Sequence, residues 1–189
     1  PDRVVGRVLL GKLWAERADA VEATGGDPLP AHRAAWAELT RALELQPDCA
    51  EALYSRAATG LSMALIDEAG GGDGTAGFVQ AEADARAAIA RGVGWAYREL
   101  GRTLRASGRT AEAMAALQAL AQAYPEQGAA DVRDLASAAP STYDPWVRVV
   151  GQANRLLESG DPIGAMVRYE QALAALRARL AELNPPARS

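Results

Sequence analysis

The chain has 189 residues, 44 of them alanine, and only 5% of its residues are aromatic. Alanine is the strongest helix former, while the β-branched and aromatic residues that strands favour are scarce, so the composition predicts helices. The formal net charge of −4 speaks against a general nucleic-acid surface, which is normally basic. A single Cys and a single His exclude an internal disulfide and a zinc cluster, and no apolar run approaches the roughly 18 residues of a membrane span.

In the first half of the chain, apolar periodicity alternates with helix breakers. The pattern predicts helices over 3–23, 31–45, 51–68 and 78–91. The breaks between them are the segment from Gly25 to Pro30, the single Pro47, and the glycine run that begins at Gly70. We interpret residues 70–77 as a flexible tether, since the run lacks the Gly-Lys-Ser/Thr ending and the preceding strand of a phosphate-binding loop.

The second half is predicted to continue with a helix from Gly94 or Trp95 to Ala106, a helix over 110–124, a short helix over 131–138, and two further helices after residue 144. Gly108 is placed to form a left-handed C-terminal cap, and Thr110 to cap the helix that follows. Asp144-Pro145 and Asp161-Pro162 each place an Asp cap before a Pro at the first helical position. The last helix is expected to end near residue 183.

One stretch of the chain carries a spaced pattern that recurs elsewhere. Its members are Tyr97, Leu100, Gly101, Leu104, Gly108, Ala113, Leu117 and Pro125. Gly101 and Ala113 are small where two antiparallel helices must approach, and Pro125 ends the second helix. The pattern resembles that of the tetratricopeptide repeat (TPR) family. The resemblance implies an all-α fold of antiparallel helix-pair repeats, stacked in a short right-handed superhelix, which is an α-solenoid of three to four units.

Partial copies of the pattern cover most of the chain, so we expect a single TPR-like domain over residues 1–189. The approximate units are 3–47, 50–92, 95–125 and 144–183, with an irregular connector over 126–143. The first two units exceed the pattern by about 12 residues each, around 24–34 and 69–77. These insertions predict either extended helices or loops that project from one edge, and long loops in compact domains are often functional or disordered.

Candidate binding residues follow from the resemblance, which implies that the first helix of each unit lines a concave groove for peptides or partner helices. Arg98, Arg102 and Arg105 lie at i, i+4 and i+7 on one such helix. Three guanidinium groups on one face suit a carboxylate-bearing ligand; the alternative is a solvated face with local salt bridges. Tyr54 and Asn154 occupy corresponding faces of other first helices.

These faces do not match the carboxylate clamp of Lys, Asn and Arg that some family members spread over three first helices. The residues found there are Lys12, Tyr54, Ala58, Arg98, Arg102 and Asn154. Tyr54, Trp95 and Trp146 stand near the starts of first helices. An aromatic residue at such a place is either a groove anchor or a packing wedge between repeats.

The last helix carries a heptad seam, in which apolar residues recur at alternating steps of three and four. The members of the seam are Met166, Tyr169, Leu173, Leu176, Leu180 and Leu183. The seam packs on the preceding helix as a cap of the solenoid, supports self-association through its four leucines, or docks a segment that is missing from this sequence.

No catalytic constellation is visible, because carboxylates such as Asp67-Glu68 and Glu82-Asp84 are adjacent or two apart and do not share a helix face. We therefore expect no catalytic residue, metal or cofactor, and no nucleic-acid partner. The expected function is a non-catalytic protein–protein interaction scaffold that binds a peptide or partner protein in the concave groove. The alternative is a regulatory or sensor segment of a larger multidomain signalling enzyme. The Arg-rich, Lys-poor usage favours a bacterial source, and the cytoplasm is favoured over the periplasm, which would require a removed signal peptide.

A circular dichroism spectrum tests the fold expected from the sequence. We expect strongly helical minima and no strand signature, because alanine and the other helix formers dominate every predicted element. Substantial β-content would contradict the helix-pair interpretation.

Overall fold

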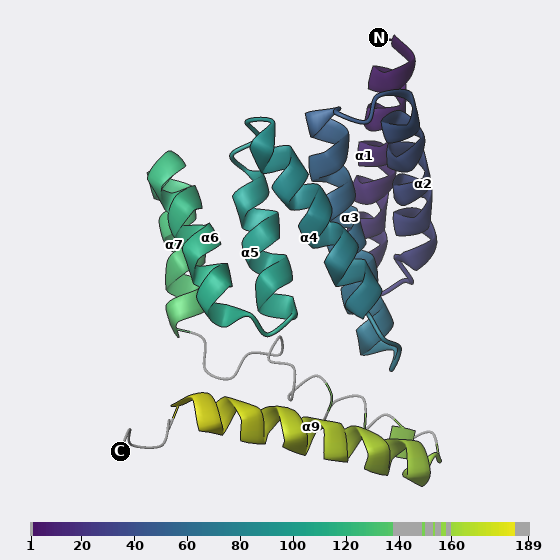
Figure 1. Cartoon of the computed structure of the whole chain (residues 1–189). Coiled ribbons are helices and arrows are strands. Elements are labelled where there is room, and N and C mark those ends of the chain that lie inside the picture. Colours follow the sequence, from purple (N-terminus) through teal and green to yellow (C-terminus); the bar gives the residue numbers. More distant parts are fainter. Residues whose placement is uncertain (1, 138–148, 150–152, 154–155, 158–159, 184–189) are drawn as a thin grey trace.

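The computed structural model describes residues 2–137, 149, 153, 156–157 and 160–183, and α1 to α7 stand side by side in it (Figure 1). In chain order they are α1 (Asp2–Ala23), α2 (Leu29–Leu45), α3 (Ala50–Ala69), α4 (Thr75–Ala90), α5 (Ala96–Ala106), α6 (Thr110–Ala123), α7 (Pro125–Ser137) and α9 (Pro162–Leu183). Within these described ranges there is no strand. The all-α fold expected from the sequence is confirmed.

Consecutive helices pack as pairs, α1 with α2, α3 with α4, and α5 with α6. α2 also packs on α3 and α4 on α5, which are the first helices of the next pairs, and α6 packs in the same way on α7. The first helices touch one another as well, α1 with α3 and α3 with α5. In a solenoid each repeat contacts only the repeats next to it in the chain. Here this arrangement places the first helices together along one side of the array.

The register of the repeat is visible in two equivalent close contacts. A Cβ atom added to Gly11 would lie 2.6 Å from Cγ of Leu39, and one added to Gly101 would lie 2.6 Å from Cδ2 of Leu117. In both pairs the leucine of the second helix therefore rests directly on the backbone of the first helix. These contacts confirm that the two helices approach at Gly101, as the pattern predicts, and they align Gly11 with Gly101.

The two insertions lengthen helices rather than adding long loops. α3 has 20 residues and α4 has 16, whereas α5 has 11 and α6 has 14. The prediction of a flexible tether over 70–77 is wrong, because only a short turn separates α3 from α4 and Gly77 lies inside α4. A Cβ atom on Gly77 would approach Cβ of Ala64 to 2.8 Å, so this glycine allows α3 and α4 to pack closely.

Glycine caps end the helices at corresponding places. Gly108 follows α5 with φ +78, and Arg109 N donates a hydrogen bond to Leu104 O at 2.9 Å. Gly160 precedes α9 with φ +85, and Asp161 N donates to Leu156 O at 2.8 Å. The left-handed cap predicted at Gly108 is confirmed, because only glycine adopts this backbone conformation without strain.

Two details of the second half differ from the prediction. Thr110 is the first residue of α6 rather than its cap; the capping position belongs to Arg109, whose side chain makes no capping hydrogen bond. The irregular connector expected over 126–143 is helical as far as Ser137, because α7 begins at Pro125. Pro125 fits there since the first turn of a helix needs no N–H donor from that position.

A buried ion pair joins three helices of the first two pairs. Arg56 of α3 donates from Nε and Nη2 to Asp84 of α4, at 2.7 and 2.8 Å. Its guanidinium also lies 5.3 Å from the ring centroid of Trp36 on α2. Since Asp84 is almost fully buried, the bidentate geometry offsets the desolvation that an isolated carboxylate would suffer.

α9 crosses beneath the array in Figure 1 and begins as predicted. Asp161 Oδ1 accepts a hydrogen bond from Gly164 N at 2.9 Å, which satisfies one of the free donors of the first turn. The helix start predicted at Asp144-Pro145 lies outside the described residues. None of the helices in the described part of the chain combines the length and apolarity needed to cross a membrane.

Gly101→Ala tests whether the close helix contact stabilises the fold. We expect a loss of about 1–3 kcal/mol in the free energy of unfolding, because the new methyl group overlaps the buried Leu117 side chain. Urea denaturation at low protein concentration measures the change. Gly6→Ala is the matched control: its Cβ meets nothing within 4 Å, so helix propensity should make it neutral or stabilising by up to about 1 kcal/mol. Equal effects at both glycines would contradict the proposed contact.

Candidate functional site

A hollow of about 180 Å³ lies on the side of the array formed by the first helices. Its apolar part comes from Leu61 and Leu65 of α3 and from Leu117 of α6. Leu117 belongs to a second helix, and it reaches the hollow because it packs directly on the backbone of α5 at Gly101, which also lines the hollow. The charged part of the lining consists of Arg102, Arg105, Asp131 and Asp134. α3, α5, α6 and α7 therefore all contribute to one site.

Arg98 connects α5 to α7 beside this hollow. Its Nε donates to Asp131 Oδ2 at 2.9 Å, and its Nη2 lies 2.8 Å from the same oxygen. The guanidinium also lies 5.3 Å from the ring centroid of Trp95. Trp95 in turn stacks on Tyr124, with ring centroids 4.2 Å apart. Of the two interpretations of Trp95, the structure therefore favours a packing wedge, which fixes the position of Arg98.

Arg102 and a buried carboxylate form the next contact along α5. Arg102 Nη1 donates to Glu99 Oε2 at 3.2 Å, and only 5% of the Glu99 side chain is exposed. Burial raises the pKa of Glu99, and the neighbouring Arg102 and Arg98 partly oppose this effect. Burial also raises the pKa of Tyr54 on α3, with Glu99 as the next cause. Tyr54, Glu99 and the two arginines thus interact across the α3–α5 contact.

The five binding residues predicted from the sequence can now be placed. Tyr54, Arg98, Arg102 and Arg105 lie on neighbouring first helices, and Arg102 and Arg105 line the hollow. Much of the arginine stripe is engaged by the protein's own carboxylates, as the salt-bridge alternative expects, although half of the Arg102 side chain is still exposed. Asn154 lies outside the described residues, and so does Trp146.

Sequence reasoning missed the apolar floor and the acidic side of the hollow. Tyr54, Ala58, Leu61 and Leu65 step by four, three and four along one face of α3, so periodicity could have extended the face to both leucines. Asp131 and Asp134 stand at i and i+3 of α7, a helix whose first turns were assigned to a connector. Their approach to α5 depends on tertiary packing and carries no sequence signal.

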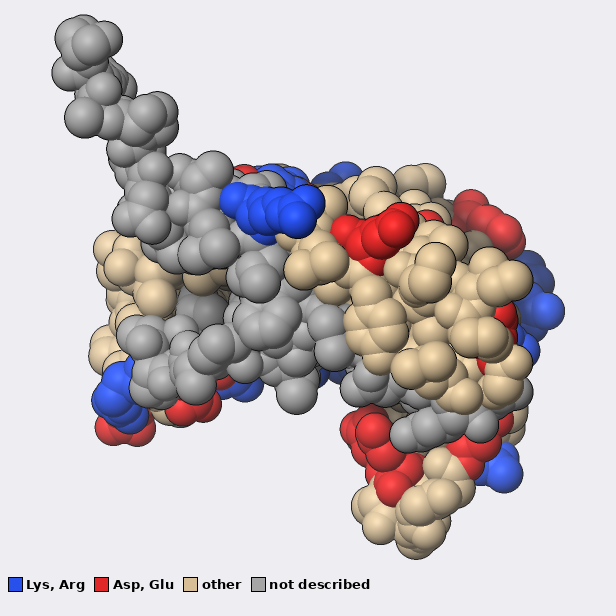
Figure 2. All heavy atoms as spheres, turned by 90° about the horizontal axis from the view of Figure 1, so that it is seen from below, with Lys and Arg blue, Asp and Glu red and all other residues tan. Residues whose placement is uncertain are grey.

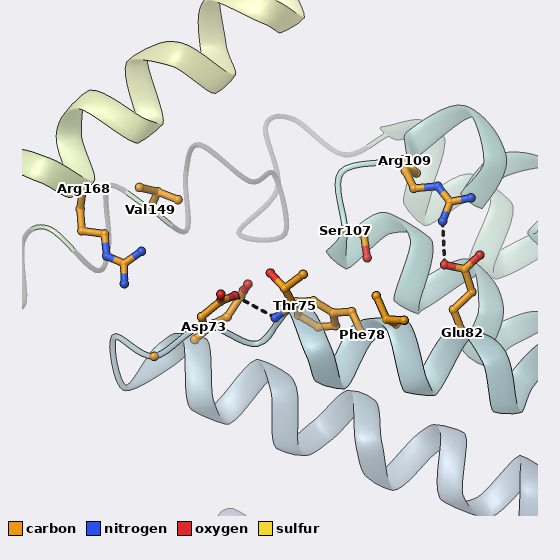
Figure 3. Close-up of a pocket in the computed structure, with 11 residues that line it drawn as sticks. Asp73, Thr75, Phe78, Glu82, Ser107, Arg109, Val149 and Arg168 are labelled. Carbon is orange, nitrogen blue, oxygen red and sulfur yellow. Dashed lines mark hydrogen bonds and ion pairs between the residues drawn. The ribbon is translucent and has the colours of Figure 1, made fainter.

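A second, larger hollow of about 450 Å³ lies where α3 ends, α4 begins and α5 ends (Figure 3). Arg168 of α9 faces it from one side and Arg109 from the other. Arg109 donates to Glu82 at 2.6 Å and to Glu112 at 2.7 Å, while Arg168 donates to Gly71 O at 3.4 Å. Hydrogen bonds from the side chain and backbone of Thr75 lower the pKa of Asp73. Arg109 thus links the turn between α5 and α6 to α4, and Arg168 links α9 to the turn between α3 and α4.

The described members of the heptad seam in α9 do not form its buried face. Met166 and Leu173 are exposed, and Tyr169 is half-buried. Ala165 and Ala172 are buried instead, which matches the small residues of the repeat pattern. The side chains of Leu176, Leu180 and Leu183 lie outside the described part of the structure.

Charged side chains are distributed without a dominant sign on the face seen from below. Figure 2 shows basic and acidic groups interspersed among uncharged residues over the described part of this face. Within the described residues, no group of three or more His, Cys, Asp or Glu side chains is arranged to hold a metal ion.

No family model matches this sequence, and no curated protein matches it. Among solved structures, the fold is similar to that of a mutant O-GlcNAc transferase from Thermobaculum terrenum, with a TM-score of 0.48 and 18% sequence identity. The match covers 79% of this chain and 26% of that chain. A likeness of this degree carries no information about function.

The geometry itself defines the class of fold. Helix pairs stack in chain order, equivalent glycine–leucine contacts recur in the first and third pairs, and glycine caps end helices at equivalent places. These features together make the described part of the chain an array of helix-pair repeats in an α-solenoid arrangement.

Glu99→Gln tests whether the buried carboxylate lowers stability when it is ionised. Because its pKa is raised on folding, the folded state binds more protons than the unfolded state between the ordinary Glu pKa of about 4.3 and the raised value. The free energy of unfolding of the native chain therefore gains a contribution as pH falls through this window. We expect Glu99→Gln to lack that gain in urea denaturation between about pH 7 and about pH 5.

His32 titrates in the same range with the opposite sign. Burial lowers its pKa, so acidification below about 6.5 protonates the unfolded state first and destabilises the fold. Since His32 is present in both proteins, the difference between the two pH profiles isolates Glu99. Identical profiles would show that Glu99 is not held in an unfavourable ionised state.

Proposed function

We propose that this chain is a member of the TPR family and a non-catalytic protein-binding scaffold, whose ligand is a peptide segment held on α3, α5 and α7. The observation that carries the proposal is the hollow between these helices, with Leu61, Leu65 and Leu117 as its apolar part and two Arg and two Asp residues around it. Apolar surface supplies affinity, and flanking polar groups orient the ligand.

The size of the hollow favours a peptide side chain over a small-molecule cofactor. Its volume of about 180 Å³ is below the roughly 300–1,000 Å³ of small-molecule pockets. One large apolar side chain would fill it. Arg102 and Arg105 suit a carboxylate or backbone carbonyl of the ligand, while Asp131 and Asp134 suit its N–H donors. The ligand class is therefore an extended peptide with an apolar residue next to an acidic one.

A binding role also agrees with the state of the carboxylates around the hollow. Asp131 is paired with Arg98, so one of its carboxylate oxygens is already engaged inside the protein. Glu99 has a raised pKa, as a catalytic acid would require, but its side chain is covered by packing between repeats and by Arg102. A substrate would have little access to it. We therefore extend the proposal to the absence of catalysis at this site.

Charge reversal of Arg102 tests the proposed groove. Peptides are first selected by the full chain from a random phage-displayed library and then synthesised. We expect them to bind Arg102→Glu at least about tenfold more weakly than the native chain, a loss of about 1.4 kcal/mol, by fluorescence anisotropy. The new carboxylate repels an acidic ligand residue and removes a donor from the rim.

Arg86→Glu on α4 is the matched control. Arg86 and Arg102 have side-chain exposures of 51% and 50%, and each is paired with a glutamate of its own helix. The two variants therefore undergo the same charge change in similar surroundings, but only Arg102 lines the hollow. The proposal fails if no peptide is enriched over the bare support, or if both variants weaken binding equally.

A further inference from the structure

The outer face of α1 presents large apolar side chains to solvent. Leu9 is 55% exposed and Leu13 is 60% exposed, and they stand about one turn apart on the helix. Gly6 lies on the same face, where an added Cβ would meet nothing within 4 Å. This face, which we call the α1 face, consists of Gly6, Leu9 and Leu13.

The repeat register shows what this face corresponds to elsewhere in the array. Since Gly11 is equivalent to Gly101, the α1 face corresponds to Ala96, Glu99 and Thr103 of α5. Those three residues are buried, with exposures of 0%, 4% and 0%, and Ala96 shares a core cluster with Ala88 of α4. In α5 this face is therefore the one that packs on the preceding helix pair, on α4 and on α3. The α1 face has the same position in the repeat, but it is uncovered.

The other end of the array carries the complementary face. Ala165 of α9 occupies the same position in the repeat pattern as Ala35 of α2. Met166 and Leu173 follow Ala165 by one and by eight residues. Their counterparts in α2 are Trp36 and Leu43. Trp36 rests on α3, since a Cβ added to Gly60 would lie 2.6 Å from Cζ3 of its ring.

Leu43 belongs to the core cluster that contains Ala52 and Leu53 of α3. In α9, by contrast, Met166 is 64% exposed and Leu173 is 50% exposed. We call these two residues the α9 face. It corresponds to the surface by which a second helix covers the next first helix, and it too is uncovered.

We propose that a second copy of this chain docks head to tail, with the α9 face of one copy packed on the α1 face of the next. The contact continues the type of interface that α2 forms on α3 and α4 forms on α5, in which Trp36 and Leu43 pack on α3 and Ala96 lies in the core. Both faces are apolar, and the space at Gly6 accepts a side chain of the arriving helix. The interface joins two different faces of the chain. A dimer therefore still has an unoccupied α1 face at one end and an unoccupied α9 face at the other, so association does not stop at a dimer.

Size-exclusion chromatography with light scattering, over a range of concentrations, measures the association of the full chain. We expect the native chain to grow from monomer to dimer and larger species as concentration rises. The α1-face variant Leu9→Glu/Leu13→Glu and the α9-face variant Met166→Glu/Leu173→Glu should each stay monomeric. Circular dichroism checks that both variants remain folded, which is expected because all four positions are on the surface.

Mixing the two variants distinguishes this arrangement from a symmetric one. Each variant keeps one intact face, so the mixture should form a 1:1 dimer and nothing larger. Leu45→Glu is the matched control, since Leu45 is 50% exposed but lies on neither face, and it should associate like the native chain. A monomeric native chain, a single variant that dimerises by itself, or a mixture that stays monomeric would each overturn the proposal.

Discussion

The close contact between a glycine of the first helix and a leucine of the second is the constraint on which the rest of the structure depends. At Gly101 and Leu117 it brings α5 and α6 together, and the same contact recurs at Gly11 and Leu39. Because Leu117 rests on the backbone of α5, it also helps to line the hollow on the side of the first helices. One packing requirement thus determines both the spacing of the helix pair and the apolar part of the candidate site.

Electrostatic compensation shapes what that site can bind. Arg98 is held by Asp131, and Arg102 is held by a glutamate whose burial raises its pKa. A ligand carboxylate must compete with these internal partners, so charge alone supplies little net affinity. Affinity would come chiefly from the apolar floor at Leu61 and Leu65, and the charged rim would select among ligands that fit it. This division of roles suits a scaffold that recognises a short motif.

The regular stacking of helix pairs that forms the groove also determines which faces are exposed at the two ends of the array. A face that is buried between inner repeats is uncovered on α1, and its complement is uncovered on α9. Head-to-tail docking would cover both ends and leave the hollow between α3, α5 and α7 accessible. Several copies of the groove would then stand in one assembly, which raises the effective concentration of sites for a ligand with several motifs.

The sequence by itself determined the fold class, the helix order and the contact at Gly101, because helix propensity and the small–large pattern act locally. It also identified Arg98, Arg102 and Arg105 as one stripe. It did not determine the partners of those arginines, or that residues 70–77 form a turn and a helix start, with Gly77 against Ala64. Only the tertiary structure decided these points. A glycine run is compatible with both a tether and close packing, and a surface charge takes whichever partner the packing of distant helices brings within reach.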